Sequence, residues 1–205
     1  MEIKYENYIW DLGGTLIDSY AVSVNVFKKI LAEFGILTAE DMIYRRMKKS
    51  STEEAAKFFG VGDIHHFMTR YRAMEKPMQE KPVLFPGAKE TLEAICNQGG
   101  QNFVISHRDH SVNQLLENAG IKSLFTEIVT SDNQLPRKPN PSSINYLIDK
   151  YHLEKSKTIL IGDRALDIEA GENAEISTAL FKSDIIIAQV KPTYTITELK
   201  ELLTI

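Results

Sequence analysis

Short apolar segments alternate with helical patterns along most of this chain, and this alternation limits the folds that it can adopt. The predicted strands are residues 8–10, 102–106, 127–131, 158–163 and 177–181, with a sixth at 194–196. Each strand is separated from the next by a sequence in which apolar residues recur with the helical period. Strands joined through helices pack as a mostly parallel sheet with right-handed crossovers. We therefore predict an α/β fold.

The alternation is interrupted once, directly after the first strand. Residues 16 to about 81 contain four helical patterns and no convincing strand. We place the N-cap of the second of these helices at Thr38 and end the fourth near Met74, because Pro77 and Pro82 then break the pattern. The chain is therefore expected to have an α/β core of residues 1–16 and 82–205 and an inserted helical domain of residues 17–81.

Composition excludes several functional classes. Of the 205 residues, 43% are hydrophobic and 25% are charged, as is usual in globular proteins, and the net charge of -4 gives no footprint for nucleic acid or anionic membrane. No run of about 18 apolar residues is present to span a membrane. Residues 1–6 lack an apolar run, so we expect no signal peptide and a cytoplasmic location. The single Cys96 cannot form an internal disulfide, and its apolar helical surroundings predict a buried side chain.

The stretch from Ile9 to Ser19 joins the first strand to the insertion and contains the sequence Asp-Leu-Gly-Gly-Thr from Asp11. Asp11 falls at the carboxyl end of a strand, where open α/β sheets bind their ligands. The two glycines that follow allow the backbone to approach a ligand closely. A carboxylate here can attack an electrophile or hold a metal ion, although a helix-capping Asp11 is the alternative.

Polar residues also follow later strands. Ser106 ends the second strand, Asp163 ends the fourth, and Lys138 lies after the third in a loop stiffened by flanking prolines. A hydroxyl and nearby N–H groups can hold phosphate oxygens, while a lysine and a cation shared with Asp163 offset their charge. With Asp11 as nucleophile, this set suits a phosphate ester. A helix cap, a solvated lysine and a turn are the ordinary alternatives, but these do not explain why each residue follows a strand.

In these motifs the chain resembles the haloacid dehalogenase superfamily. The first motif is Asp11–Thr15, the second is Ser106, the third is Lys138 and the fourth is Gly162–Asp167. The resemblance covers most of the chain, and the inserted helices look like the α-helical cap of phosphoglycolate-phosphatase-like and phosphoglucomutase-like members. It implies a Rossmann-like, doubly wound parallel sheet with strand order 3-2-1-4-5 and a cap over the ligand crevice.

The resemblance also implies the chemistry. Asp11, Ser106 and Lys138 are the expected catalytic residues, with Asp11 forming a phosphoaspartyl intermediate. Mg²⁺ is the expected cofactor, and a small phosphorylated metabolite, phosphoglycolate-like by analogy, is the expected substrate. Asp167 would orient a metal-bound water or a neighbouring ligand. The candidate metal-site residues are Asp11, Gly13 through its carbonyl oxygen, Asp163 and Asp167.

Substrate contacts are expected from the same loops. Thr15 is expected to bond the site loop rather than react. His107 and Arg108 directly follow the second motif and either contact the phosphate or substrate or face solvent. The candidate substrate-binding residues are Gly14, Thr15, Ser106, His107, Arg108 and Lys138.

One position departs from the phosphatase pattern of this family. Family phosphatases carry a second aspartate two residues after the nucleophile as general acid and base, and Gly13 occupies that position here. Family dehalogenases and phosphonoacetaldehyde hydrolases also differ at this position, and the hydrolases use a cap lysine as a Schiff base. Lys48 and Lys49 lie in the insertion. Cleavage of C–P or C–halogen bonds therefore stays an alternative, as does a degenerate protein that binds a phosphometabolite or a partner without turnover.

Overall fold

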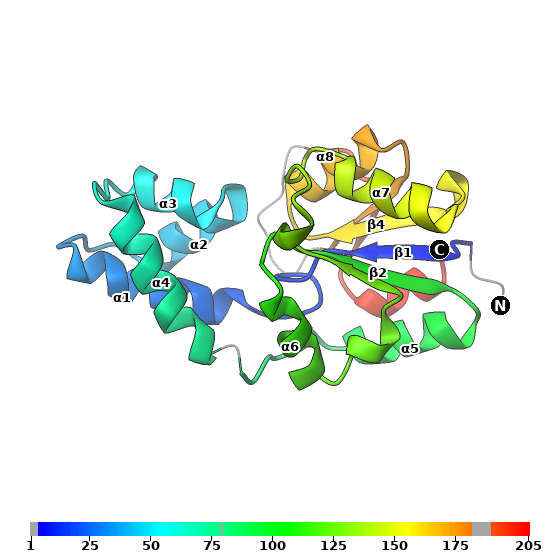
Figure 1. The fold of residues 1–205 in the computed structure, drawn as a ribbon, viewed down its shortest axis with the longest axis horizontal. Helices are drawn as coiled ribbons and strands as arrows, with labels where there is room; N and C mark the ends of the chain where they lie inside the picture. Colours follow the sequence, from blue (N-terminus) through cyan, green and yellow to red (C-terminus); the bar gives the residue numbers. More distant parts are fainter. Residues whose placement is uncertain (1–3, 79, 182–189) are drawn as a thin grey trace. The chain divides into compact units, whose positions relative to one another are not determined.

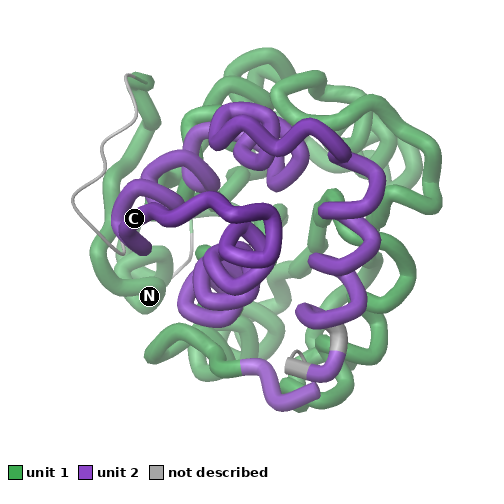
Figure 2. The backbone as a smooth tube through the Cα atoms, turned by 90° about the vertical axis from the view of Figure 1, so that its left-hand side faces the viewer, with its two compact units in different colours: residues 1–18, 83–205 green, residues 19–82 purple. Residues whose placement is uncertain are grey.

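The structure of the chain, a computed structural model, describes residues 4–78, 80–181 and 190–205. Residues 1–3, the first half of the stretch in which we expect no signal peptide, lie outside the described residues. The chain divides into two compact units, which Figure 2 shows in two colours. Unit 1 comprises Met1–Asp18 and Val83–Ile205, and unit 2 comprises Ser19–Pro82.

Unit 1 is built on a parallel sheet of the order β3-β2-β1-β4-β5-β6 (Figure 1). This arrangement confirms the predicted doubly wound α/β fold and the order 3-2-1-4-5, with β6 added at one edge. The strands are β1 (Asn7–Trp10), β2 (Gln101–Ile105), β3 (Glu127–Val129), β4 (Thr158–Gly162), β5 (Ser177–Phe181) and β6 (Tyr194–Ile196).

Helices cover both faces of this sheet (Figure 1). They are α5 (Ala88–Asn97), α6 (Ser111–Asn118), α7 (Ser142–Tyr151) and α8 (Ala165–Asn173), with short 3-10 turns η1 (Lys122–Leu124), η2 (Ser131–Asn133), η3 (Lys155–Lys157) and η4 (Leu199–Leu203). Successive side chains of a strand point to opposite faces. Trp10 therefore joins the core beneath α5 and η4, while Ile9 joins the core beneath α7 and α8. The buried strands fix the position of the loops at their carboxyl ends.

Unit 2 contains four helices around a core of its own. They are α1 (Tyr20–Glu33), α2 (Glu40–Lys49), α3 (Thr52–Phe58) and α4 (Ile64–Met78). Phe27 of α1 and Phe67 of α4 are fully buried, and their ring centroids lie 4.9 Å apart in an edge-to-face arrangement. Ser51 caps α3, since its hydroxyl accepts from the N–H of Glu54.

The two chain crossings between the units lie side by side within unit 1. The N–H of Asp18 donates to the carbonyl of Val83 (2.8 Å), and the N–H of Phe85 donates to the carbonyl of Leu16 (3.0 Å). Ile17 and Leu84 form an antiparallel bridge between these two hydrogen bonds. The chain thus leaves unit 1 and returns to it at adjacent points.

Three local predictions are wrong. Helix α2 begins at Glu40 with Ala39 as its N-cap, because Glu40 and Asp41 supply the negative charge that favours a helix start, and Thr38 is not the cap. Helix α4 continues through Pro77, since a proline near the end of a helix removes only one hydrogen bond. Cys96 is exposed, because Leu92 and Ile95 form the buried stripe of α5.

A fourth prediction is also wrong: the sequence pattern predicts a closing α-helix over residues 198–203, and the structure has the 3-10 turn η4 there. Among the described residues, no helix is both long enough and apolar enough to cross a membrane.

Candidate active site

The loop after β1 holds Asp11 at the end of the sheet. The N–H of Asp11 still donates to the carbonyl of Ile161 on β4 (2.8 Å), so its backbone continues the sheet. The chain then turns at Gly14, whose φ of 90° is open to glycine but strained for other residues. The N–H groups of Leu16 and Ile17 both donate to the carbonyl of Leu12 (3.0 Å each) and close the turn. The Asp11 carboxylate therefore stands on a rigid support.

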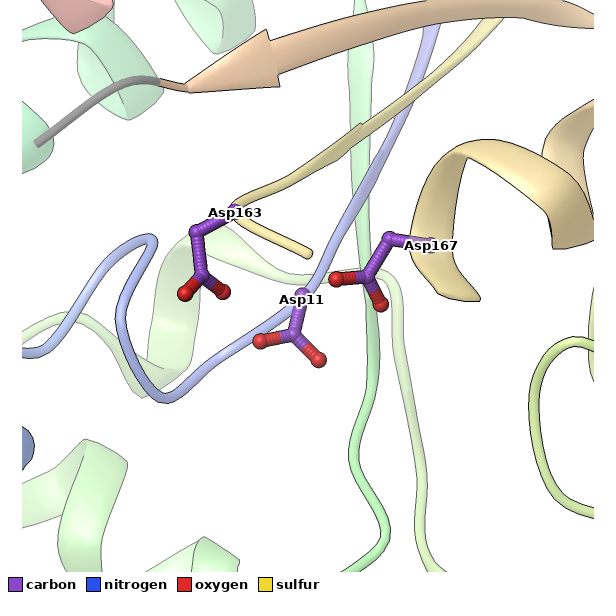
Figure 3. Close-up of side chains that lie close together, drawn as sticks. All are labelled: Asp11, Asp163 and Asp167. Atoms are coloured by element: carbon purple, nitrogen blue, oxygen red, sulfur yellow. The ribbon is translucent and has the colours of Figure 1, made fainter. Parts of the chain in front are cut away.

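Three buried aspartates meet at this end of the sheet (Figure 3). Asp11 follows β1, Asp163 follows β4, and Asp167 lies in the first turn of α8. One carboxylate oxygen from each lies within 4.8 Å of the others. Gly162 makes this approach possible, because a Cβ atom there would overlap the Asp167 side chain. Carboxylate oxygens at this spacing are suitable ligands for a hard divalent cation.

Lys138 lies between two of these carboxylates. Its Nζ is 2.5 Å from Oδ1 of Asp11 and 2.5 Å from Oδ1 of Asp167, and its side chain is buried. Burial alone lowers the pKa of Lys138, but the two carboxylates outweigh that effect and hold its pKa above the ordinary value. For Asp167 the signs are opposite. Burial alone raises its pKa, but the positive charges of Lys138 and Arg164 outweigh that effect and hold the pKa of Asp167 below its usual range. Both groups are therefore charged in the folded protein.

Arg164 is a second cation at the site, and it is not among the residues that the sequence predicts there. Its Nη2 lies 3.9 Å from Oδ1 of Asp11, and its Nε lies 3.9 Å from Oδ2 of Asp167. Its backbone N–H also donates to Oδ2 of Asp167 (3.1 Å). The signal available from the sequence was its place inside the fourth motif, directly after Asp163.

The electrostatic balance at Asp11 fits a metal ion. Burial raises the pKa of Asp11 to about 6, and Asp167 and Asp163 add to this effect against the opposing charges of Lys138 and Arg164. The buried cluster thus concentrates three acidic side chains around Asp11, and their mutual repulsion favours a bound positive charge. Among the described residues, Oδ2 of Asp11 is buried and has no hydrogen-bond partner. A divalent cation would offset this repulsion and give Oδ2 a ligand role.

Thr15 lies beside the third aspartate. It is fully buried, and its hydroxyl donates to Oδ1 of Asp163 (3.3 Å). This hydrogen bond joins the loop after β1 to the loop after β4. Gly14 makes a backbone contact within the loop after β1, since its N–H donates to the carbonyl of Ile17 (2.8 Å).

The loop after β2 carries the remaining candidates. The N–H of Ser106 donates to the carbonyl of Val129 on β3 (2.9 Å), and its hydroxyl accepts from the N–H of Arg108 (3.2 Å). Nε2 of His107 lies 3.0 Å from the backbone nitrogen of Lys138 and accepts its N–H. Burial, together with the charges of Lys138, Arg137 and Arg164, lowers the pKa of His107 to about 3. His107 is therefore a neutral, half-buried residue that contacts the loop of residues 134–141, called here the lysine loop.

Comparisons with known proteins identify relatives of this chain. A family described as haloacid dehalogenase-like hydrolase matches residues 8–181. A hydrolase from Streptococcus pneumoniae has a solved structure that is similar, with 43% sequence identity and a TM-score of 0.68 over 88% of this chain and 94% of that one.

Two relatives carry the names of phosphatases. Pyrophosphatase PpaX of Oceanobacillus iheyensis is 26% identical over 96% of this chain and 94% of its own length. A phosphoglycolate phosphatase of Agrobacterium fabrum is 29% identical over 90% of this chain and 84% of its own length. The similarity therefore extends over both units.

Proposed function

We propose that this chain, which belongs to the haloacid dehalogenase-like hydrolase family, is a Mg²⁺-dependent phosphatase of a small phosphorylated metabolite. Membership confirms the resemblance seen in the four motifs. The observation that carries the proposal is Lys138, which lies 2.5 Å from both Asp11 and Asp167 in a cluster of three buried aspartates. The names of the relatives support phosphate as the group that is removed. The expected cytoplasmic location stays a prediction.

The residues of the site suggest how attack would occur. A carboxylate oxygen of Asp11 would attack phosphorus, the bond to the leaving-group oxygen would break, and a phosphoaspartate would remain on Asp11. Water would then hydrolyse this intermediate and release phosphate. Lys138 would hold the Asp11 carboxylate and offset charge on the phosphoryl oxygens, and Ser106 and backbone N–H groups after β2 would bind those oxygens.

The three aspartates do not have equivalent surroundings. Oδ1 of Asp167 forms an ion pair with Lys138 Nζ (2.5 Å) without a hydrogen bond of good geometry, and Oδ2 accepts from the backbone N–H of Arg164 (3.1 Å). Oδ2 of Asp11 has no such partner among the described residues. We therefore assign direct metal binding to Asp11 and Asp163, with the carbonyl of Gly13, and an orienting role to Asp167. A bound Mg²⁺ would supply positive charge that offsets the negative charge on the phosphoryl oxygens.

Gly13 determines which substrates suit this site. A glycine retains the backbone carbonyl but has no side chain to give a proton to the leaving group or to activate water. A positioned general acid or base contributes about 10²–10⁴-fold in rate. We therefore propose that aryl phosphates, acyl phosphates and phosphoanhydrides, whose leaving groups depart without a proton, are turned over better than alkyl phosphates.

The variant Gly13→Asp tests this part of the proposal. Wild type is expected to accumulate phosphoenzyme in a burst measurement and to show rates that fall as the pKa of the leaving group rises. The variant should hydrolyse alkyl phosphates faster, provided that the new carboxylate fits beside Gly14. Equal rates for wild type and variant on an alkyl phosphate, with no dependence on the leaving group, would show that another residue supplies the proton.

Unit 2 is proposed as the cap that sets substrate specificity. Within this unit Lys48 is buried, with its Nζ 4.8 Å from the ring centroid of Tyr20 and 5.8 Å from that of Tyr44. Cation–π contacts are made by the ammonium form of lysine, whereas a Schiff base forms from the neutral amine. These contacts support a structural role for Lys48, and Lys49 is exposed.

The experiment that tests the function is a panel of phosphorylated compounds, including pyrophosphate, phosphoglycolate and an acyl phosphate, assayed with Mg²⁺ and with excess chelator. We expect phosphate release that requires Mg²⁺ and is lost in Asp11→Asn. Asp149→Asn, which changes an exposed aspartate on α7, is the matched control. Release of halide or cleavage of phosphonoacetaldehyde would favour the alternative chemistries, and binding of phosphometabolites without turnover would favour a degenerate member.

A further inference from the structure

His107 is a titratable group near the aspartates, and the proposed chemistry does not explain its contacts. It directly follows Ser106 at the end of β2, and it is half-buried. A histidine in this place is the obvious candidate to replace the missing acid and base of position 13. Its hydrogen bond argues for a different role.

The ring nitrogen that points at the lysine loop is already in use. Nε2 of His107 lies 3.0 Å from the backbone nitrogen of Lys138. A backbone N–H can only donate, so Nε2 must be the unprotonated nitrogen, and the ring proton belongs on Nδ1. The environment keeps the ring in this form, since burial and the charges of Lys138, Arg137 and Arg164 lower the pKa of His107 to about 3. A group in this state is a constant acceptor and a poor carrier of protons.

Among the described residues, the loop around Lys138 is also joined to α8, since the side-chain amide of Asn173 donates to the carbonyl of Pro139 (3.0 Å), but that bond does not involve the backbone of Lys138 itself. Pro136 and Pro139 have no N–H, and the N–H of Asn140 donates to Arg137 within the loop itself (3.0 Å). The hydrogen bond from Lys138 to His107 therefore joins this loop to a different strand end. The backbone of β2 is in turn fixed, because the N–H of Ser106 donates to Val129 on β3.

We propose that His107 is a positioning residue, which holds the backbone of Lys138 so that its ammonium group lies between Asp11 and Asp167. The proposal rests on the proposed function for its rate effects, but the hydrogen bond can be tested without activity. A catalytic group displaced by about 1 Å can lose about 100-fold in rate. Removal of the acceptor at His107 is therefore expected to lower kcat by about 10- to 100-fold.

Two substitutions separate positioning from proton transfer. His107→Phe keeps a planar ring and removes the acceptor, while His107→Gln places an amide oxygen near the position of Nε2. A positioning role predicts that kcat falls in His107→Phe and is restored to within about threefold of wild type in His107→Gln, since an acceptor is all that is needed. His110→Phe is the matched control, because that histidine is exposed on the same loop and bonds Asp132.

Readouts that need no turnover accompany the rates. Ring ¹⁵N shifts of wild type should show Nε2 unprotonated and Nδ1 protonated. Hydrogen exchange at the Lys138 amide should be slow in wild type and His107→Gln and at least 10-fold faster in His107→Phe. Equal loss of kcat in both His107 variants would overturn positioning in favour of proton transfer, and unchanged exchange at Lys138 in His107→Phe would also overturn it. Absence of phosphate release from wild type, with the exchange pattern intact, would refute the proposed function alone.

Discussion

Replacement of the proposed nucleophile should make the metal-free protein more stable. The Asp11 carboxylate is buried, and its pKa is raised from the ordinary 3.8 to about 6, first by burial and then by the neighbouring Asp167 and Asp163. The folded state therefore binds the Asp11 proton more tightly than the unfolded state does. The stability that this group contributes is fully present below about pH 4 and is lost as the pH rises through about 6. Asp11→Asn cannot lose a proton and avoids this loss.

The size of the effect follows from the pKa values. A change from 3.8 to about 6 corresponds to about 3 kcal/mol of unfolding free energy at pH 8, at about 1.4 kcal/mol for each tenfold change in proton affinity. At pH 4 most of this difference is absent, because the Asp11 carboxyl of the folded protein is then protonated. The amide oxygen of the new side chain can still accept from Lys138, so this hydrogen bond is retained. A chain of this length gains roughly 2–4 °C in Tm per kcal/mol, or roughly 6–12 °C at pH 8.

The assay is urea and thermal unfolding of wild type and Asp11→Asn in chelator at pH 8 and pH 4, with Asp149→Asn as the control at an exposed position. Saturating Mg²⁺ at pH 8 should stabilise wild type more than Asp11→Asn, since the ion binds a carboxylate better than an amide. A variant less stable than wild type at pH 8 in chelator, or a difference that does not change with pH, would refute the electrostatic reasoning.

Three further outcomes are expected. Asp163→Asn should raise the Mg²⁺ concentration needed for half-maximal phosphate release by at least 10-fold, which a metal titration measures, and an unchanged titration would remove Asp163 from the metal site. Gly162→Ala should lower kcat and destabilise unit 1 by roughly 1–3 kcal/mol, because the added Cβ overlaps the Asp167 side chain. The control is Gly100→Ala, whose Cβ also meets crowded atoms but just before β2, at the end of the strand opposite to Ser106. It should lower stability without a specific change in Mg²⁺ dependence. Replacement of residues 19–82 by a short linker is sterically feasible because Asp18 and Val83 are hydrogen-bonded to each other (2.8 Å), and it should leave slow hydrolysis of aryl phosphates with altered substrate ranking; an unchanged ranking would contradict the assignment of unit 2 as a specificity cap.

The sheet could be predicted from the sequence because its signals are local. Each strand is a short apolar run next to a helix with the helical period, and residues 158–162 and 177–181 are buried at nearly every position. The errors arose where two local signals competed. Cys96 has apolar neighbours, but the helical period places it beside the buried stripe rather than on it.

Part of the site could be predicted from the topology of the sheet. Asp11 and Asp163 end neighbouring strands β1 and β4, and parallel order brings the ends of such strands together. The contact between His107 and Lys138 had no such signal, because two loops 31 residues apart meet only after β2 and β3 have paired. The place of Arg164 in the fourth motif does not by itself assign it to the site. The direction of its side chain depends on the turn that starts α8.

The described residues suit the two requirements of the proposed reaction, attack on phosphorus and proton transfer, to different degrees. The groups that we propose for attack on phosphorus lie together, since Asp11 follows a hydrogen-bonded turn and Lys138 Nζ lies 2.5 Å from its Oδ1. A group that moves protons is missing at position 13, and His107 offers its Nε2 to a backbone N–H instead. Lys138 lies between two carboxylates, which hold its proton in place. The barrier to attack should therefore be low only when the leaving group is a weak base, so the chemistry of the leaving group, as much as the shape of unit 2, would select the substrate.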